Sequence, residues 1–67
     1  MTDRIGWVVI TYNQASHMPE IDPRTELYLG REDAEFALDV MRDETAEAGR
    51  RERHVLAEVV DLGEPVT

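Results

Sequence analysis

The sequence predicts an α+β domain with the element order β-β-α-β. It comprises a three-stranded sheet with the first strand central and one acidic amphipathic helix on one face. Three segments are rich in β-branched and aromatic residues, one long segment repeats its apolar residues with the helical period, and glycines and prolines separate them. Sixteen of the 67 residues are Leu, Ile, Val or Phe, which exceeds the roughly one fifth that marks disorder. Residues 1–67 are therefore predicted to form a single small domain.

The first strand is predicted over residues 5–12, which read Ile-Gly-Trp-Val-Val-Ile-Thr-Tyr. Side chains alternate between the two faces of a strand. One face then carries Trp7 and Val9, and the other carries Val8, Ile10 and Tyr12. A strand that is apolar on both faces is usually central in its sheet, which gives the predicted strand order.

The next part of the chain is predicted to be a loop followed by a short strand. Residues 13–24 contain two prolines and several turn formers and have no periodicity, so they predict a long loop. Residues 25–29, Thr-Glu-Leu-Tyr-Leu, alternate in the way of a strand.

A helix is predicted over residues 31–48, with Gly30 as its N-cap and Gly49 just past its end. At 100° per residue its apolar stripe comprises Ala34, Ala37, Leu38, Met41, Thr45 and Ala48. Phe36 falls outside this stripe, so it is predicted to be partly exposed or covered by something that this chain does not supply.

The last strand is predicted over residues 54–62, followed by a tail over 63–67. A right-handed crossover through the helix makes the second and third strands parallel to each other, on either side of the first. The alternative is that the third strand pairs directly with the second.

One helix covers only one face of such a sheet, although the first and last strands are apolar on both faces. The uncovered face is predicted to be an interface, with self-association into a homodimer as the leading explanation. The predicted apolar surface comprises Trp7, Val9 and Phe36, although the register decides whether Val8, Ile10 and Tyr12 are uncovered instead. A flat monomer and a heteromeric partner are the alternatives.

The charge balance excludes several functional classes. Fifteen carboxylates oppose seven arginines, for a net charge of −8, and the chain has no lysine and no cysteine. Disulfides and cysteine-ligated zinc are excluded, and direct nucleic-acid binding through a basic patch is not expected. The longest apolar run, residues 7–10, is too short to span a bilayer, and no signal-peptide pattern is present. A cytoplasmic protein without membrane association is predicted.

Most of the negative charge belongs to the helix, where seven carboxylates and two arginines give a net −5. Its outward face carries Glu32, Glu35, Asp39 and Asp43, about one turn apart. Carboxylates roughly 5–6 Å apart can imitate the phosphates of a nucleic acid. This face is predicted to bind a basic partner, such as a nucleic-acid-binding protein, and its finer interpretation is a DNA mimic. The alternative is a solvated face that keeps the protein soluble.

Tyr12, His17 and Met18 are the binding candidates of the loop, whose alternative role is a plain connector. No metal site or cofactor is predicted, because no ligand spacing links His17 with His54. No catalytic residue is predicted either, because the chain has neither a cysteine nucleophile nor a Gly-rich phosphate loop.

Residues 29–38, Leu-Gly-Arg-Glu-Asp-Ala-Glu-Phe-Ala-Leu, and 53–60, Arg-His-Val-Leu-Ala-Glu-Val-Val, carry a resemblance. This second half of the chain resembles small uncharacterised accessory proteins of high-GC bacteria and their phages. The resemblance implies a stand-alone accessory protein and carries over no functional residues.

Taken together, these features predict a small acidic, non-enzymatic protein-interaction module that self-associates and binds a basic surface of a partner protein. A dimeric small-molecule-binding protein is the first alternative. A small enzyme with its site at the dimer interface is the second.

Overall fold

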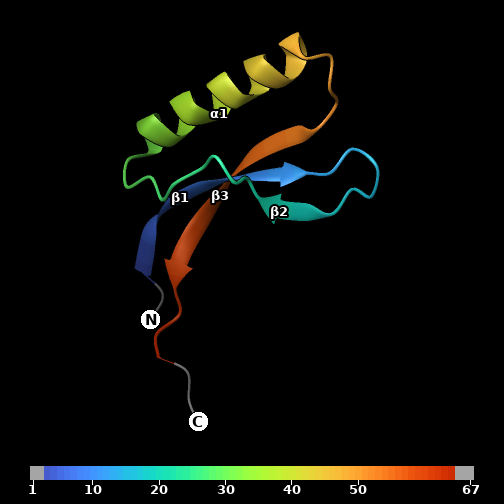
Figure 1. Cartoon of the computed structure of the whole chain (residues 1–67). Helices are drawn as coiled ribbons and strands as arrows, with labels where there is room; N and C mark the ends of the chain where they lie inside the picture. Colours follow the sequence, from blue (N-terminus) through green and yellow to red (C-terminus); the bar gives the residue numbers. More distant parts are fainter. Residues whose placement is uncertain (1–2, 65–67) are drawn as a thin grey trace.

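The computed structural model describes residues 3–64, which form three strands and one helix. These elements are β1 (Asp3–Tyr12), β2 (Pro19–Ile21), α1 (Arg31–Glu47) and β3 (Arg53–Asp61). The strands form a sheet in the order β2-β1-β3, with both outer strands antiparallel to β1, and α1 lies across one face (Figure 1). The predicted α+β fold with a central first strand is confirmed, and the direct pairing of the second and third strands is excluded. Residues 65–67 of the predicted tail lie outside the described residues.

The second strand lies earlier in the chain than predicted. β2 falls inside the predicted loop over 13–24, because the chain after β1 makes a tight turn closed by a hydrogen bond from Asn13 N to Met18 O of 3.0 Å. The prediction of a strand over 25–29 was wrong. That segment still follows the edge of β1, but it forms only an isolated bridge between Trp7 and Tyr28. A turn at 22–25 interrupts the pairing between β2 and this bridge.

The helix matches its predicted bounds to within one residue. Gly30 is the N-cap, and its carbonyl oxygen accepts the Ala34 N–H at 3.2 Å. At the other end Gly49 adopts a φ of 71°, the left-handed conformation that glycine tolerates best. Gly49 N donates to Ala46 O and Arg50 N donates to Thr45 O, the paired bonds of a Schellman motif. The chain thereby leaves α1 in the direction that returns it to the sheet as β3.

The apolar core lies between α1 and the sheet. It contains Val9, which is fully buried, together with Leu38 and Met41 from the predicted stripe of the helix. Leu56 of β3 packs against this group. Few side chains build this core, so the fold leaves much apolar surface elsewhere.

Gly6 lies where the 25–29 segment passes closest to β1. A β-bulge in β1 occurs between residues 4 and 6, and a Cβ at Gly6 would lie 2.3 Å from the backbone carbonyl oxygen of Tyr28. Only glycine allows the two backbones to approach this closely.

We predict that Gly6→Ala lowers the free energy of unfolding by about 2 kcal/mol, because a backbone group rather than a flexible side chain must move. Urea unfolding followed by circular dichroism measures this change. Gly30→Ala is the matched control, because its Cβ would meet only the Asp33 carboxylate, at 3.4 Å. Equal stability of the Gly6→Ala variant and the wild type would contradict the close approach.

Candidate functional site

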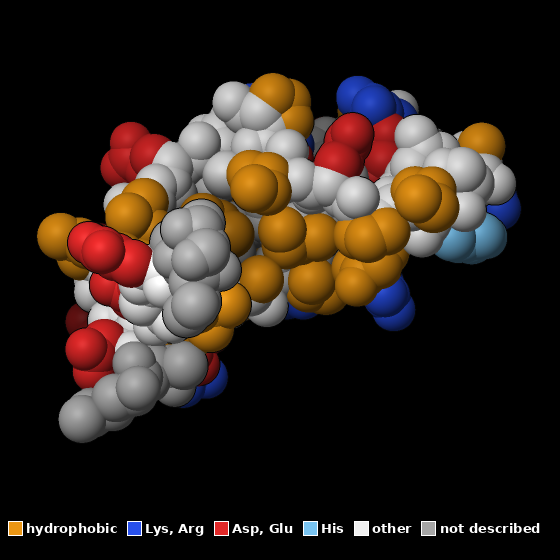
Figure 2. Space-filling model, turned by 90° about the horizontal axis from the view of Figure 1, so that it is seen from below, with side chains coloured by type: hydrophobic (Ala, Val, Ile, Leu, Met, Phe, Trp, Pro, Cys, Tyr) orange, Lys and Arg blue, Asp and Glu red, His pale blue; other side chains and the backbone are white. Residues whose placement is uncertain are grey.

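The face of the sheet opposite α1 is apolar and uncovered. The apolar residues that point to this side, referred to below as the open sheet face, are Val8, Ile10, Tyr12, Pro19, Ile21, Val55, Ala57 and Val59. Arg53, the register partner of Tyr12, lies at one end of the same side. The strand register places them side by side, since Ile10 lies between Ile21 and Val55. Figure 2, which looks at the molecule from the side away from α1, shows a band of hydrophobic side chains along the sheet.

The structure corrects the predicted apolar surface. Val9 is fully buried and Trp7 shares its face, so both lie on the covered side of the sheet. The alternative register holds, and Val8, Ile10 and Tyr12 are uncovered instead. Phe36 is 72% exposed, as its place outside the helical stripe predicts.

A buried polar network lies beside the core on the covered side. Thr11, Asp22 and His54 are all more than nine-tenths buried. The Thr11 hydroxyl donates to Asp22 Oδ2 at 2.7 Å and lies 2.8 Å from His54 Nδ1. On the other side of the ring, His54 Nε2 lies 2.6 Å from the Thr45 hydroxyl of α1. The network therefore joins both long strands, the turn after β2 and the helix.

These contacts select one tautomer for a neutral His54 ring. Because the Thr11 hydroxyl gives its one proton to Asp22, its oxygen accepts a hydrogen bond from His54 Nδ1–H. In the neutral ring, Nε2 then accepts the hydrogen bond of Thr45. His54 is thus held in one tautomer by two hydroxyl groups. Its position opposite Thr11 in the sheet is a consequence of register, which the sequence alone does not provide.

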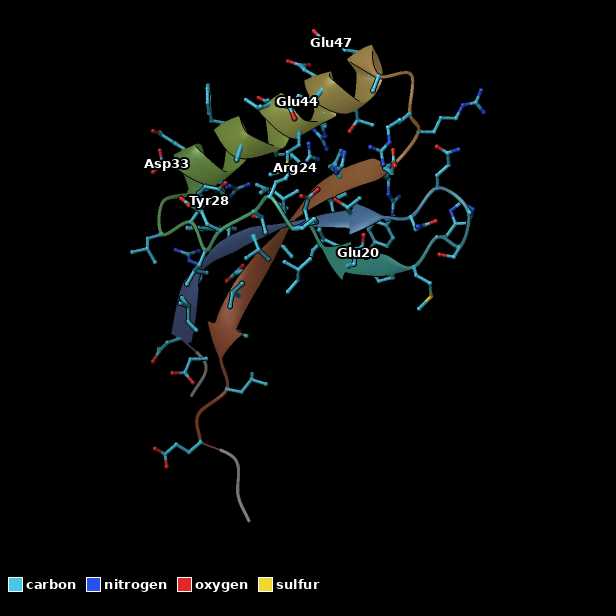
Figure 3. The ribbon with its side chains drawn as sticks, in the orientation of Figure 1. Glu20, Arg24, Tyr28, Asp33, Glu44 and Glu47 are labelled. Carbon is cyan, nitrogen blue, oxygen red and sulfur yellow. The ribbon has the colours of Figure 1, made fainter. Side chains whose placement is uncertain are left out.

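Asp22 is held in its ionised form by Arg24. Arg24 donates its backbone N–H and its Nε to Asp22 Oδ1 and its Nη2 to Oδ2, at 2.8 to 3.1 Å. These bonds, with that from Thr11, outweigh the effect of burial and lower the pKa of Asp22 from 3.8 to about 2. Arg24 also donates to Glu44 of α1 at 2.8 Å, and Figure 3 shows it between the turn and the helix.

A hydroxyl, an imidazole and a carboxylate in series can activate a nucleophile. Here Thr11 separates His54 from Asp22, and Arg24 already compensates the carboxylate charge. The network borders a polar pocket of about 320 Å³. The geometry of the network is suited to holding β1, the turn after β2, α1 and β3 together. No three His, Cys, Asp or Glu side chains within residues 3–64 converge to hold a metal ion.

The predicted partner-binding residues of α1, Glu32, Glu35, Asp39 and Asp43, are all exposed. Arg31 pairs with Glu35 at 3.0 Å, while the other three form no ion pair within the described chain. Beside them, a groove of about 520 Å³ runs between α1 and residues 24–28. Phe36, Val40 and Tyr28 contribute apolar surface to this groove, and Glu26, Asp33 and Glu44 contribute carboxylates.

The structure brings together two of the three loop candidates. Tyr12 and His17 line one pocket with Arg51 and Arg53, whereas Met18 lies outside that lining and is 65% exposed. The sequence offers no signal for the two arginines, because they follow the helix and meet the loop only through the pairing of β3 with β1. His17 and His54 line different pockets.

Comparisons with models of protein families, with curated proteins and with solved structures find no match. The resemblance to accessory proteins therefore stays a prediction. Within the described residues, no helix combines the length and the apolar character needed to cross a membrane.

We predict that Asp22 makes the fold sensitive to acid. Because its pKa is lower in the folded protein than in the unfolded chain, its stabilisation is complete above about pH 4 and is lost as the pH falls toward 2. The lost contribution is about 2 kcal/mol. Urea unfolding between pH 2 and pH 6 measures it as the difference between the wild type and Asp22→Asn, which should shrink as the pH falls.

Asp39→Asn, which removes an exposed carboxylate of α1, controls for the loss of one charge. A difference between the wild type and Asp22→Asn that stays constant with pH would contradict this role.

Proposed function

We propose that this chain is a small cytoplasmic, non-enzymatic interaction module. It self-associates through the open sheet face and turns the acidic side of α1 toward a basic surface of a partner protein. The single observation that carries the proposal is the continuous apolar surface over all three strands on the side without a helix.

The total surface supports self-association. The accessible surface is 5357 Å² for a chain of 7.7 kDa, whereas a compact monomer of this mass exposes about 4,300 Å². The chain thus exposes about 1,000 Å² more than a compact monomer of its mass. Packing two open sheet faces against each other would remove part of this excess from water.

The far end of the sheet supports the same conclusion. Beyond the helix, the start of β1 and the end of β3 continue as a two-stranded arm (Figure 1). Val59 of this arm belongs to the open sheet face and is half-buried, whereas Val60 points to the other side, beyond the helix, and is 41% exposed. A two-stranded ribbon is only marginally stable in water, so contact with a second copy would stabilise the arm.

Association through the free edge of β3 is the competing geometry. Arg42 of α1 covers one end of this strand by donating to the His54 carbonyl oxygen at 3.2 and 3.3 Å. Glu58 and Asp61 place carboxylates farther along the strand. Charged side chains on an edge strand oppose edge-to-edge pairing, which favours the open sheet face as the interface.

We predict that Ile21→Arg weakens self-association. Ile21 is 64% exposed on the short strand β2, so the monomer tolerates the charge, but a face-to-face dimer would have to bury it. The dimer dissociation constant should rise by roughly tenfold or more, equivalent to ~1.4 kcal/mol. Sedimentation equilibrium measures this constant.

Phe36→Arg is the matched control, because Phe36 is similarly exposed but lies on α1. A wild type that stays monomeric at high micromolar concentration, or an equal effect of the two variants, would contradict the proposed interface.

The second part of the proposal concerns the acidic side of α1. Glu32, Asp39 and Asp43 are exposed and have no ion pair within residues 3–64, so their charge is available to a partner. The neighbouring groove adds exposed apolar surface from Phe36 and Val40. Carboxylates beside an apolar groove complement a partner segment that combines arginines or lysines with apolar side chains. A nucleic-acid-binding protein is such a partner.

We predict that a triple variant, Glu32→Gln, Asp39→Asn and Asp43→Asn, loses roughly tenfold or more in affinity for a synthetic helical peptide with arginines flanking leucines. Fluorescence anisotropy measures the affinity, and wild-type binding should weaken as salt increases.

The control neutralises three exposed carboxylates outside the helix, Asp3, Glu20 and Glu58, and changes the net charge equally. Equal losses in both triple variants would mean that overall charge, rather than this helix face, attracts the peptide.

A further inference from the structure

The turn after β1 and the start of β3 form a pocket of unusual charge. It has a volume of about 710 Å³ and is lined by Tyr12, Asn13, Gln14, His17, Arg51 and Arg53, which are called the arginine end below. None of these six residues is a carboxylate, although 15 of the 67 residues of the chain are acidic. Figure 2 shows imidazole and arginine side chains gathered at one end of the molecule.

The two arginines of this pocket are free to bind an anion. Arg24, Arg31 and Arg50 each pair with a carboxylate. Arg51 and Arg53 form no ion pair with any residue of the described chain, and Arg53 instead stacks over the Tyr12 ring at 4.3 Å. Two guanidinium groups without an ion pair therefore lie in one pocket of a protein with a net charge of −8. This arrangement favours binding of a negatively charged partner.

Hydrogen bonds hold the walls of the pocket in place. The Asn13 side-chain oxygen accepts the N–H groups of Ala15 and Ser16 at 2.8 and 3.1 Å, which fixes the turn. Gln14 Oε1 accepts the Arg51 N–H at 3.0 Å and ties this turn to the segment before β3. The pocket is therefore preorganised, which reduces the entropy cost of binding.

His17 is the one residue other than glycine with a positive φ, 59°, within the described chain. This conformation costs an L-residue roughly 1–2 kcal/mol relative to glycine. The strained turn nevertheless holds an imidazole against the pocket of the two arginines. Such strain is commonly found at binding sites, where the side chain rather than the backbone is needed.

We propose that the arginine end binds the phosphate group of a small phosphate-bearing molecule. Guanidinium groups offer paired N–H donors that match phosphate oxygens, and an imidazole adds a further donor. The stacked Arg53 and Tyr12 side chains provide a flat surface beside this site for a ring attached to the phosphate. This site is separate from the acidic side of α1 but shares Tyr12 with the end of the open sheet face.

The test is a titration of the ¹⁵N-labelled protein followed by NMR at constant ionic strength, with inorganic phosphate, adenosine monophosphate and adenosine as separate probes. We expect saturable shifts of the Arg51 and Arg53 side-chain Nε–H signals with both phosphate-bearing probes and not with adenosine. Tighter binding of adenosine monophosphate would identify a nucleotide-like ligand. Equal affinity for adenosine monophosphate and inorganic phosphate would mean that the site recognises the phosphate group alone.

Arg51→Gln and Arg53→Gln should each weaken phosphate binding by roughly tenfold, since a charge-assisted bond is lost. Arg4→Gln is the matched control: Arg4 also stacks on an aromatic ring, that of Trp7 at 4.7 Å, but lies outside the pocket. His17→Asn removes the imidazole with a residue that accepts a positive φ, and it should weaken binding while leaving the fold intact.

Three results would overturn the proposal. These are shifts that rise linearly without saturation, an equal response to adenosine, and an equal loss of affinity in Arg4→Gln. The amide spectra of the variants show directly whether each remains folded, and because Arg51 is exposed its replacement tests the site even if Arg53→Gln disturbs Tyr12.

Discussion

Residues 3–64 contain one helix to cover a three-stranded sheet, and the rest of the structure follows from that limited coverage. β1 is apolar on both faces, but α1 reaches only the side that carries Val9. The other side, with Ile10 between Ile21 and Val55, faces water. Burial of apolar surface is the main favourable term in folding, so a domain with half of its sheet uncovered gains stability when something covers the remaining face.

The same limited coverage explains why polar contacts are so prominent in the interior. Next to the few apolar side chains of the core, Thr11, Asp22 and His54 are buried and hydrogen-bonded to one another. Buried polar groups cost stability unless they are paired, but when paired they require one geometry. Here they determine how the turn after β2, the helix and β3 meet. The apolar contacts attract these segments to each other, and the polar network sets their relative positions.

Charge is separated along the molecule in a way that the net value of −8 conceals. Carboxylates cover the outer side of α1, whereas the turn after β1 and the segment before β3 form a pocket with no carboxylate in its lining, where Arg51 and Arg53 lie beside His17. A surface that only keeps the protein soluble does not require this separation of negative from positive charge. Two surfaces of opposite sign and one apolar face are three distinct places for contact on a small domain.

The sequence by itself determined the element types, the central position of the first strand, the helix with its glycine ends and the exposure of Phe36, because these depend on local periodicity and local backbone conformation. The tertiary structure decided what depends on register and on long-range pairing. Only the pairing of β1 with its neighbours shows that β2 begins at Pro19, since a three-residue strand has no period to detect. The register likewise turned Val9 inward, set His54 opposite Thr11, and brought arginines and a histidine together from segments more than thirty residues apart.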